Sequence, residues 1–309
     1  MRILIIDAFT DRPFAGNPAG VCLLETDSWP DEQWMRQVAR ELNLSETAFV
    51  RPPSQADDAT GMGAEGEVDW LLRWFTPMTE VPLCGHATLA ATHALRTQGL
   101  TDGRPIRFGS LSGVLTATPQ ADGTISLDFP AARPQPTEVP DGLAQALGRP
   151  VVGCWTTGEL DVLLVELRSE HSVRGLAPDL AAVTRQQARG VAVTALAEHP
   201  ADGYDFVSRY FAPAAGVPED PVTGSAHTAL APFWAERLGR TVLTGYQASA
   251  RGGLVHCELR TAPRSPAETS PTGTSPADNA PTGAGWDRVL LSGRAVTVLD
   301  GRLTLSAAS

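Results

Sequence analysis

The chain has 309 residues, of which 42% are hydrophobic, and its formal net charge is −11. This composition is typical of a globular protein with room for two domains, and no apolar run approaches the roughly 20 residues of a membrane span. The negative charge argues against nucleic acid or an anionic membrane as a partner. It leaves a small anionic substrate open, because helix N-termini attract anions locally.

The absence of lysine, the first residues and the spacing of the cysteines limit which cofactors and which cellular compartment are expected. The chain contains no lysine, and a pyridoxal phosphate enzyme needs a lysine for its Schiff base, so this cofactor is excluded. The first residues form a strand interrupted by Asp7 rather than a secretory segment. The cysteines are scattered without metal-type spacing, which predicts a cytoplasmic protein with free thiols; they are Cys22, Cys84, Cys154 and Cys257.

The first part of the chain alternates strands with two helices. Apolar periodicity predicts helices at 31–42 and 86–98. A polar loop is expected at 55–67, and the glycines at 61, 63 and 66 within it precede a strand, which is the wrong context for a dinucleotide site. Strands are expected at 2–9, 21–24, 46–50, 70–75, 106–108, 113–118 and 124–129.

The second part repeats this order after a proline-rich linker at 130–140. Strands are expected at 151–157, 161–167, 190–197 and 205–211, and helices at 178–189 and 226–238. The recurrence predicts a duplicated domain, with halves at 1–120 and 121–309. Residues 262–286 are rich in Pro, Ser, Thr and Ala and are predicted to be a flexible insertion, and the last strand is free to pack back on the first half.

Each half contains the same turn between a strand and a helix. In the first, the apolar segment 74–83 leads to Cys84-Gly85-His86, and in the second, segment 210–222 leads to Thr223-Gly224-Ser225. A glycine lets the backbone approach a ligand, and the free N–H groups of the following helical turn hold an anion. Two such turns that face each other would present two helix N-termini to one anionic ligand.

Four side chains near these turns are candidates for chemistry. Glu46 begins a strand of small and apolar residues, where partial burial would raise the pKa of its carboxyl and suit proton transfer, although a capping or surface role is the simpler interpretation. His86, Asp220 and Ser225 supply a donor, an acid and a hydroxyl at the two turns, and helix capping explains each of them alone equally well.

A second interpretation of the site assigns the chemistry to Cys84. A cysteine at a helix N-terminus is expected to have a lowered pKa and to serve as a base. A cofactor-free racemase needs a second thiol on the facing turn, but the repeat places Thr223 there. His86 and His93 could share a helix face, yet no third ligand follows at metal spacing, so no metal site is predicted.

Five motifs together resemble the PhzF family of phenazine biosynthesis, which is related in fold to diaminopimelate epimerase. They lie at 7–20, 43–49, 73–77, 84–88 and 219–227, in that order and over nearly the whole chain. The resemblance implies an α+β fold with two pseudo-symmetric halves, each a curved, mostly antiparallel sheet around a central helix. It also implies a homodimer, no cofactor and an active site between the halves.

The resemblance assigns roles to particular residues. It implies that Glu46 is the acid/base group and that His86, Asp220 and Ser225 bind the substrate, while Gly85, Gly224 and Asn17 border the cleft. The predicted function is a cofactor-independent isomerase that moves a proton within a small, cyclic, unsaturated carboxylic or amino acid. A racemase or epimerase that uses Cys84, and a non-catalytic protein that binds small acids, are the alternatives.

Overall fold

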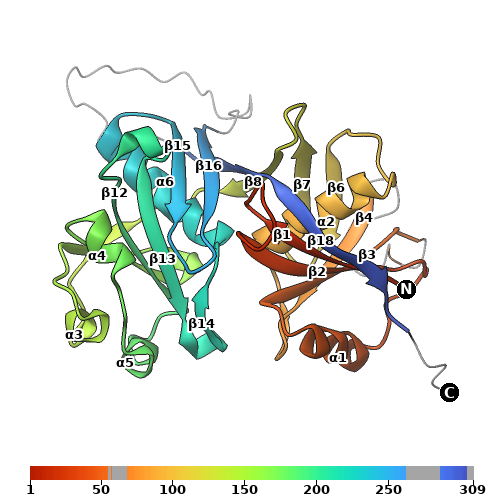
Figure 1. Ribbon diagram of the computed structural model, residues 1–309, viewed down its shortest axis with the longest axis horizontal. Coiled ribbons are helices and arrows are strands. Elements are labelled where there is room, and N and C mark those ends of the chain that lie inside the picture. Colours follow the sequence, from red (N-terminus) through yellow and green to blue (C-terminus); the bar gives the residue numbers. More distant parts are fainter. Residues whose placement is uncertain (55–56, 58–67, 262–285, 305–309) are drawn as a thin grey trace, which may run out of the picture.

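The computed structural model describes residues 1–54, 57, 68–261 and 286–304, and its strands and helices form two lobes that lie side by side (Figure 1). The strands of the described residues belong to one continuous mixed sheet, shared by the lobes. The α-helices are α1 (Glu32–Leu42), α2 (Gly85–Thr97), α3 (Leu143–Leu147), α4 (Glu170–Arg174), α5 (Leu180–Thr184) and α6 (Gly224–Leu238).

The first lobe is built from the early strands and the last one. Its hydrogen-bonded order is β18-β1-β2-β3-β4-β6-β7-β8, with β5 paired to β4 as a short hairpin. The strands are β1 (Arg2–Ala8), β2 (Asn17–Leu23), β3 (Glu46–Arg51), β4 (Trp70–Phe75), β5 (Glu80–Val81), β6 (Ile106–Ser110), β7 (Gly113–Pro119), β8 (Ile125–Pro130) and β18 (Ala295–Arg302).

The second lobe repeats this arrangement. Its order is β9-β10-β11-β12-β13-β15-β16-β17, with β14 paired to β13. The strands are β9 (Gln135–Thr137), β10 (Gly153–Thr156), β11 (Val162–Glu166), β12 (Gly190–Leu196), β13 (Phe206–Ala212), β14 (Val217–Asp220), β15 (Val242–Gln247), β16 (Gly253–Arg260) and β17 (Arg288–Gly293).

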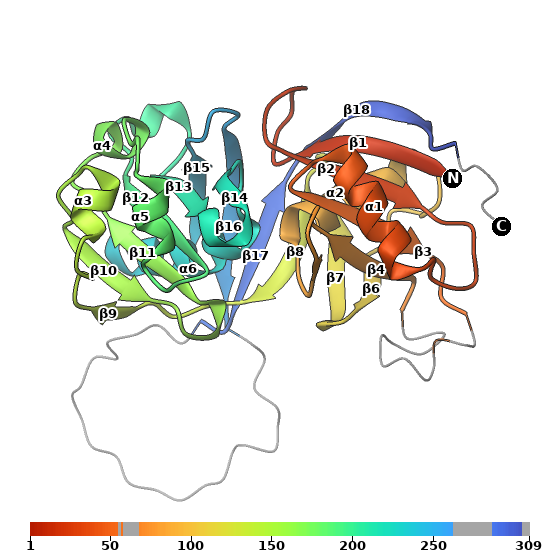
Figure 2. The same cartoon turned by 90° about the horizontal axis from the view of Figure 1, so that it is seen from below.

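The parallel pairs show that the lobes share one topology. In the first lobe β2 pairs parallel with β3, and β4 pairs parallel with β6. In the second lobe β11 and β12, and then β13 and β15, form the equivalent parallel pairs. The lobes are joined where β8 pairs antiparallel with β17, and the chain then returns so that β18 lies against β1 in the first lobe (Figures 1 and 2).

A buried helix lies at the centre of each lobe. Helix α2 packs against β1, β2, β3, β7, β8 and β18, and α6 packs against β11, β15, β16 and β17. Both helices are rich in alanine and buried along most of their length, because the curved sheet surrounds them and leaves little room for large side chains. This is the predicted α+β fold, in which each sheet curves around a central helix.

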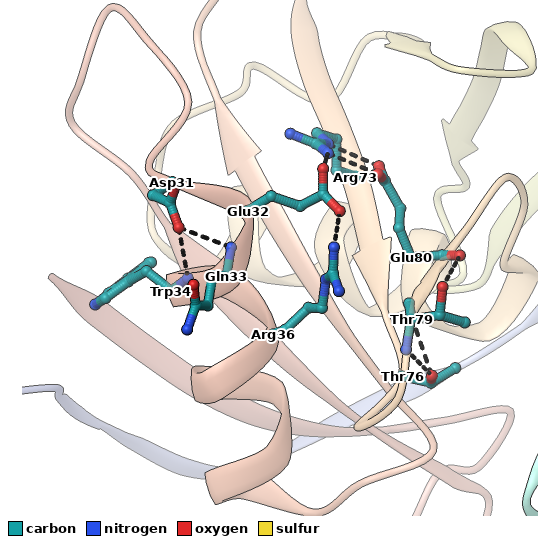
Figure 3. Close-up of polar contacts among 9 residues, drawn as sticks. All are labelled: Asp31, Glu32, Gln33, Trp34, Arg36, Arg73, Thr76, Thr79 and Glu80. Atoms are coloured by element: carbon teal, nitrogen blue, oxygen red, sulfur yellow. Dashed lines mark hydrogen bonds and ion pairs between the residues drawn. The ribbon is translucent and has the colours of Figure 1, made fainter.

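Polar contacts fix the hairpin that precedes each central helix. In the first lobe Arg73 on β4 forms a bidentate ion pair with Glu80 on β5, and the Oγ1 atom of Thr76 accepts the N–H of Thr79 at 3.0 Å (Figure 3). In the second lobe Arg209 pairs in the same way with Glu219. Bidentate arginine–carboxylate pairs restrict geometry as well as adding energy, so they set where each turn into its helix begins.

Helix α1 begins as the sequence indicates. Asp31 caps it, since the Asp31 carboxylate accepts the backbone N–H groups of Gln33 and Trp34 (Figure 3). The helix ends at Asn43, which adopts a left-handed conformation with φ 50°. Asparagine tolerates this conformation better than most residues, and the resulting turn leads into β3.

Two predicted elements differ from the structure. The helix expected at 178–189 is only the short α5, since the chain leaves the helical conformation and Gln187 takes φ 54° before β12. The linker expected at 130–140 contains the strand β9, which pairs with β10. Most of the polar loop predicted at 55–67 and of the insertion predicted at 262–286 lies outside the described residues.

The four cysteines are free and buried. Among the described residues, no helix has both the length and the apolar character needed to cross a membrane.

Removal of β18 tests how much the first lobe depends on the C-terminal strand. A chain ending at Arg294 would leave β1 paired only with β2, with its other edge exposed, and would also lose the ion pair of Arg2 with Asp300. Because unpaired strand edges promote aggregation, we expect a large fall in melting temperature and in soluble yield. A chain ending after Thr304 keeps β18 and is the matched control. Equal melting temperatures for the two truncations would contradict this role of β18.

Candidate active site

The two central helices meet end to end between the lobes. A Cβ atom added at Gly85 would lie 3.7 Å from the Cα of Gly224, and one added at Gly224 would lie 3.6 Å from the Cα of Gly85. These distances are ordinary van der Waals contacts, so one added carbon at either glycine would touch the backbone of the other helix, and the two helix ends approach closely. The sequence prediction that the two turns face each other therefore agrees with the structure.

Both helix N-termini lack side-chain caps. The N-cap residues are Cys84 for α2 and Thr223 for α6, and neither side chain forms a capping hydrogen bond. Serine, threonine, aspartate or asparagine usually satisfies such N–H groups, and here the threonine is engaged elsewhere. Two uncapped N-termini that converge create positive potential suited to an anion.

A small cavity of about 80 Å³ opens at this junction. It is lined by residues of both lobes, which are Glu46, Leu83, Cys84, Gly85, His86, Arg189, Tyr210, Ala212, Ala215, Val217, Asp220, Thr223, Gly224 and Ser225. All of the predicted site residues except Asn17 are in this set.

Glu46 lies at the first position of β3, directly opposite Ala19 of β2. Its side chain is 18% exposed. Burial raises the pKa of the Glu46 carboxyl to about 8, and the negative charge of Asp220 adds to the rise, while a hydrogen bond with Cys84 and the charge of Arg189 oppose it. A carboxyl with this pKa can both hold and release a proton near neutral pH.

His86 lies between Glu46 and Cys84. Its Nε2 atom is 3.4 Å from Oε2 of Glu46, and its Nδ1 atom is 3.4 Å from Sγ of Cys84. Burial lowers the pKa of His86 to about 3, so the ring is neutral at physiological pH. Nε2 has no hydrogen-bond partner within the described part of the chain and is available to a ligand.

Asp220 faces the cavity from the second lobe and is held in place from behind. The Nδ2 atom of Asn17 donates to its Oδ1 atom at 2.8 Å, the hydroxyl of Thr223 donates to Oδ2, and Gln247 donates to its backbone oxygen at 2.7 Å. Burial raises the pKa of Asp220, and the hydrogen bonds from Thr223 and Asn17 partly offset the rise. Asn17, which was predicted to border the cleft, is fully buried and holds the Asp220 carboxyl.

The Cys84 thiol does not have the lowered pKa that was predicted from its position at a helix N-terminus. The pKa of its thiol is raised well above the ordinary value, first by burial and then by the nearby charges of Glu46 and Asp220. The expectation of a lowered pKa is therefore wrong, because these effects outweigh the helix N-terminus. A thiol in this state is a poor base.

The ligand atoms of Glu46, Cys84 and His86 lie within 4.8 Å of one another. This is the spacing of a three-residue metal site, which the sequence did not indicate. A metal would require Cys84 as a thiolate, and burial beside carboxylates disfavours that form. The predicted absence of a metal stays a prediction.

Sequence analysis assigned no role in the site to Arg189 or to Tyr210, which begins the segment 210–222. Arg189 is the only arginine among the described residues that line the cavity, and its guanidinium has no ion-pair or hydrogen-bond partner in the described ranges. Burial raises the pKa of Tyr210 to about 12, so its hydroxyl stays protonated. Neither residue belongs to a recognisable motif, and only the fold brings them to the site.

Strand registers explain why Tyr210 reaches the cavity. Thr47 pairs with Phe75 in the first lobe, and Val191 pairs with Phe211 in the second. The preceding residues, Glu46 and Gly190, are therefore equivalent. A Cβ atom at Gly190 would lie 2.2 Å from the Tyr210 hydroxyl, so the tyrosine uses space that a side chain at position 190 would need.

The sequence profile of a family described as phenazine biosynthesis-like protein matches residues 6–301. An uncharacterized isomerase of Pseudomonas aeruginosa is 42% identical over 306 residues, which are 99% of each chain. The human phenazine biosynthesis-like domain-containing protein is 38% identical over 319 residues, covering 98% of this chain and 99% of the human one.

Solved structures agree with these sequence similarities. The crystal structure of a PhzF family protein from Enterococcus faecalis matches 98% of this chain and 99% of its own, with a TM-score of 0.80 and 34% identity. A probable proline racemase from Agrobacterium radiobacter has a TM-score of 0.59 at 12% identity, and shares only the fold. The family resemblance and the fold predicted from the sequence are thus confirmed.

The raised pKa of Glu46 predicts a pH-dependent stability. Between the unfolded pKa of 4.5 and the folded value of about 8, the folded state keeps a proton that the unfolded state loses. The contribution of Glu46 to the free energy of unfolding therefore falls as the pH rises from 4.5 to about 8. Glu46→Gln removes the effect, so its melting temperature should exceed that of the wild type at pH 9 and lose this advantage at pH 5.

The control is Glu138→Gln, which changes an exposed glutamate. Thermal unfolding at pH 5, 7 and 9 measures all three proteins. A melting-temperature difference between Glu46→Gln and the wild type that is independent of pH would show that Glu46 titrates normally.

Proposed function

Because the chain belongs to the phenazine biosynthesis-like (PhzF) family and is an isomerase, we propose that it moves a proton within a small carboxylic or amino acid, with Glu46 as the acid/base group and without a cofactor. The observation that carries this proposal is the position of Glu46. Its carboxyl has a pKa raised to about 8 and lines the cavity where two uncapped helix N-termini meet.

The N-termini of α2 and α6 would bind the acidic group of the substrate. A substrate carboxylate placed beside Gly85 and Gly224 would accept backbone N–H groups from both helices. Ser225, at the second position of α6, offers a hydroxyl that has no partner among the described residues. These contacts would fix the substrate with one carbon toward Glu46.

Proton transfer then needs no other base. Ionised Glu46 accepts a proton from a carbon activated by unsaturation, and the same carboxyl, now neutral, returns it to another carbon of the same substrate. The neutral His86 ring next to it can donate a hydrogen bond to the charge that develops in between, without itself titrating. Asp220, held by Asn17 and Thr223, would orient a polar group on the opposite side.

The wider predictions remain part of this proposal. The substrate would be a cyclic, unsaturated acid, and the enzyme would act as a cytoplasmic homodimer. Support for an acidic substrate comes from the helix N-termini and from Arg189, the only arginine among the described residues that line the cavity.

The racemase alternative requires two thiolates on opposite sides of one carbon. The structure places Thr223 where the second thiol would be, and the Cys84 thiol has a raised pKa. A protein that only binds small acids would have no need for a carboxyl tuned to exchange protons, and the environment of Glu46 counts against it.

Replacement of Glu46 tests the proposed chemistry. Glutamine keeps the shape of the side chain but cannot carry the proton, so Glu46→Gln should bind substrate and lower turnover by roughly 10²–10⁴. Cys84→Ala is the matched control, because a protonated thiol does not take part and most activity should remain. NMR in D₂O would follow isomerisation of a panel of unsaturated carboxylic acids by the three proteins.

The opposite pattern would point to different chemistry. If Cys84→Ala lost about 10³-fold in kcat while folded, and Glu46→Gln did not, thiol catalysis would replace the proposal. Activity that depends on added flavin or a metal ion would also contradict it.

Arg189 should act on both binding and proton transfer. Its positive charge lowers the pKa of Glu46, so Arg189→Gln should raise the pKa of Glu46 and shift the acidic limb of the pH–rate profile upward. The Michaelis constant for an anionic substrate should rise as well. Arg185→Gln is the control, because the Arg185 guanidinium binds the backbone oxygen of Ala181 outside the cavity. An unchanged pH profile would remove Arg189 from the site.

A further inference from the structure

A cavity of about 280 Å³, lined by residues of both lobes, is separate from the one that contains Glu46. The two cavities share no described lining residue. The buried ring of Phe9 lines this cavity on one side and lies 3.9 Å from a Cβ atom added at Gly224 on the other, so it stands between them. We call this space the loop cavity, and the residues with polar side chains in its wall are Thr10, Asp11, Arg12, Tyr246, His256 and Arg294.

The wall of the loop cavity is held by contacts between the lobes. It is formed by the loop between β1 and β2, by the hairpin of β15 and β16, and by the start of the link from β17 to β18. The N–H of Gly16 donates to the backbone oxygen of Gly252 at 2.7 Å, and the guanidinium of Arg251 donates to the Asp7 carboxylate at 2.7 Å. These bonds join the first loop to the hairpin and fix the shape of the space between them.

Two arginines in the wall have no partner for their charge. The guanidinium groups of Arg12 and Arg294 form no ion pair or hydrogen bond within the described ranges, in contrast to that of Arg251, which Asp7 neutralises. Asp11 is the one acidic residue among the described lining residues. The wall therefore carries more positive than negative charge, in a chain whose formal net charge is −11.

Two further polar groups in the wall are free to bind a ligand. The Tyr246 hydroxyl has no hydrogen-bond partner among the residues that the structure describes. The Nδ1 atom of His256 is 3.0 Å from Oγ1 of Thr244, which leaves Nε2 available. Partial burial lowers the pKa of the His256 ring, the charge of Asp122 opposes this change, and the charge of Arg294 adds to it. The ring is thus close enough to Arg294 for both to contact one anion.

This set of groups suits a tetrahedral anion. A guanidinium can donate two parallel N–H bonds to an anion, and two guanidinium groups, a phenol and an imidazole offer more donors than the two oxygens of a carboxylate need. A phosphoryl group has three terminal oxygens to accept them. At roughly 30 Å³ for a water molecule, the cavity also has space for part of the molecule that carries the phosphoryl group.

We propose that the loop cavity binds the phosphoryl group of a small phosphorylated molecule, through Arg12 and Arg294, with Tyr246 and His256 as further contacts. The ligand is a molecule other than the substrate, because Phe9 separates the loop cavity from the cavity that contains Glu46. Binding therefore does not depend on the proposed function.

NMR of the histidine rings in the full-length protein tests the site. Glycerol 3-phosphate and inorganic phosphate are titrated at constant pH and at an ionic strength held constant with sodium chloride. The ring signals of His256 should shift and saturate with both, and glycerol 3-phosphate should bind at least as tightly as inorganic phosphate. Acetate should bind roughly tenfold or more weakly, because it offers fewer acceptor oxygens.

Substitutions in the wall identify the groups that bind. Arg12→Gln and Arg294→Gln should each weaken glycerol 3-phosphate roughly tenfold or more, because a charge-assisted bond is lost. Asp11→Asn should tighten binding severalfold, since it removes a negative charge from the wall. Arg168→Gln is the matched control, because Arg168 is exposed, has no ion pair or hydrogen bond in the described ranges and lies outside the cavity. Both wall arginines are exposed as well, so the melting temperatures of these variants without phosphate should equal that of the wild type.

Four results would overturn the proposal. They are the absence of a saturable shift of His256, equal affinities for acetate and the phosphates, binding of inorganic phosphate without glycerol 3-phosphate, and an equal loss of affinity in Arg168→Gln. Phosphate that shifts the signals of His86 but not those of His256 would also overturn it, because the anion would then lie at the helix N-termini beside Glu46. None of these measurements requires turnover, so the loop cavity and the proposed chemistry can fail independently.

Discussion

The close approach of the two helix ends at Gly85 and Gly224 is the constraint on which the rest of the site depends. Two helices can meet end to end only if neither places a large side chain at the junction, and glycine at both positions allows it. The partial positive charges of two helix N-termini then converge without side-chain caps. The acidic ligand that we propose would be stabilised by these partial charges between the lobes.

The duplicated halves differ at the proposed active site. The lobes share strand order, the parallel crossovers and the bidentate pairs Arg73–Glu80 and Arg209–Glu219. At the site, equivalent positions carry different chemistry.

The first lobe has Glu46 and His86, and the second has Gly190 and Ser225 in their places. A symmetric pair of carboxyls would give two equivalent bases, whereas one carboxyl opposite a small residue leaves space for a substrate and for the hydroxyl of Tyr210.

The sequence was enough to predict what depends on local pattern. The two glycine turns, the α+β class and the position of Glu46 after Asn43 follow from turn residues, apolar periodicity and family motifs, and the structure places these residues together. The sequence was not enough to predict properties that depend on residues far away in the chain. The pKa of Cys84 is set by Glu46 and Asp220, which are far from it in the chain, so its local position at a helix N-terminus was misleading.

Dependence on distant parts of the chain also explains why the sequence did not predict Arg189 or the cavities between the lobes. Arg189 ends a predicted helix that the structure shortens to α5, and it reaches the cavity only because the chain leaves the helix before β12. Another cavity, of about 390 Å³, is formed by the end of β8 in one lobe and by residues 157–160 and α6 in the other, and no motif joins them. Cavities between lobes are a property of the packed fold, and sequence periodicity describes only the faces that are buried within each lobe.

Hydrogen bonds restrain the carboxyls of Asp220 and Glu46, on the two sides of the cavity, to different degrees. Asp220 is fixed by Asn17, Thr223 and Gln247, so its carboxyl is oriented before any substrate arrives.

Within the described residues, Glu46 has only the hydrogen bond with Cys84 in place of such a set of donors, and burial makes its ionised form costly. A carboxylate stabilised by several hydrogen bonds would be a weaker base, because those bonds favour the charged form. The lack of support for Glu46 is thus consistent with a group that must take up and release a proton, whereas the network around Asp220 is consistent with a group that must stay in place.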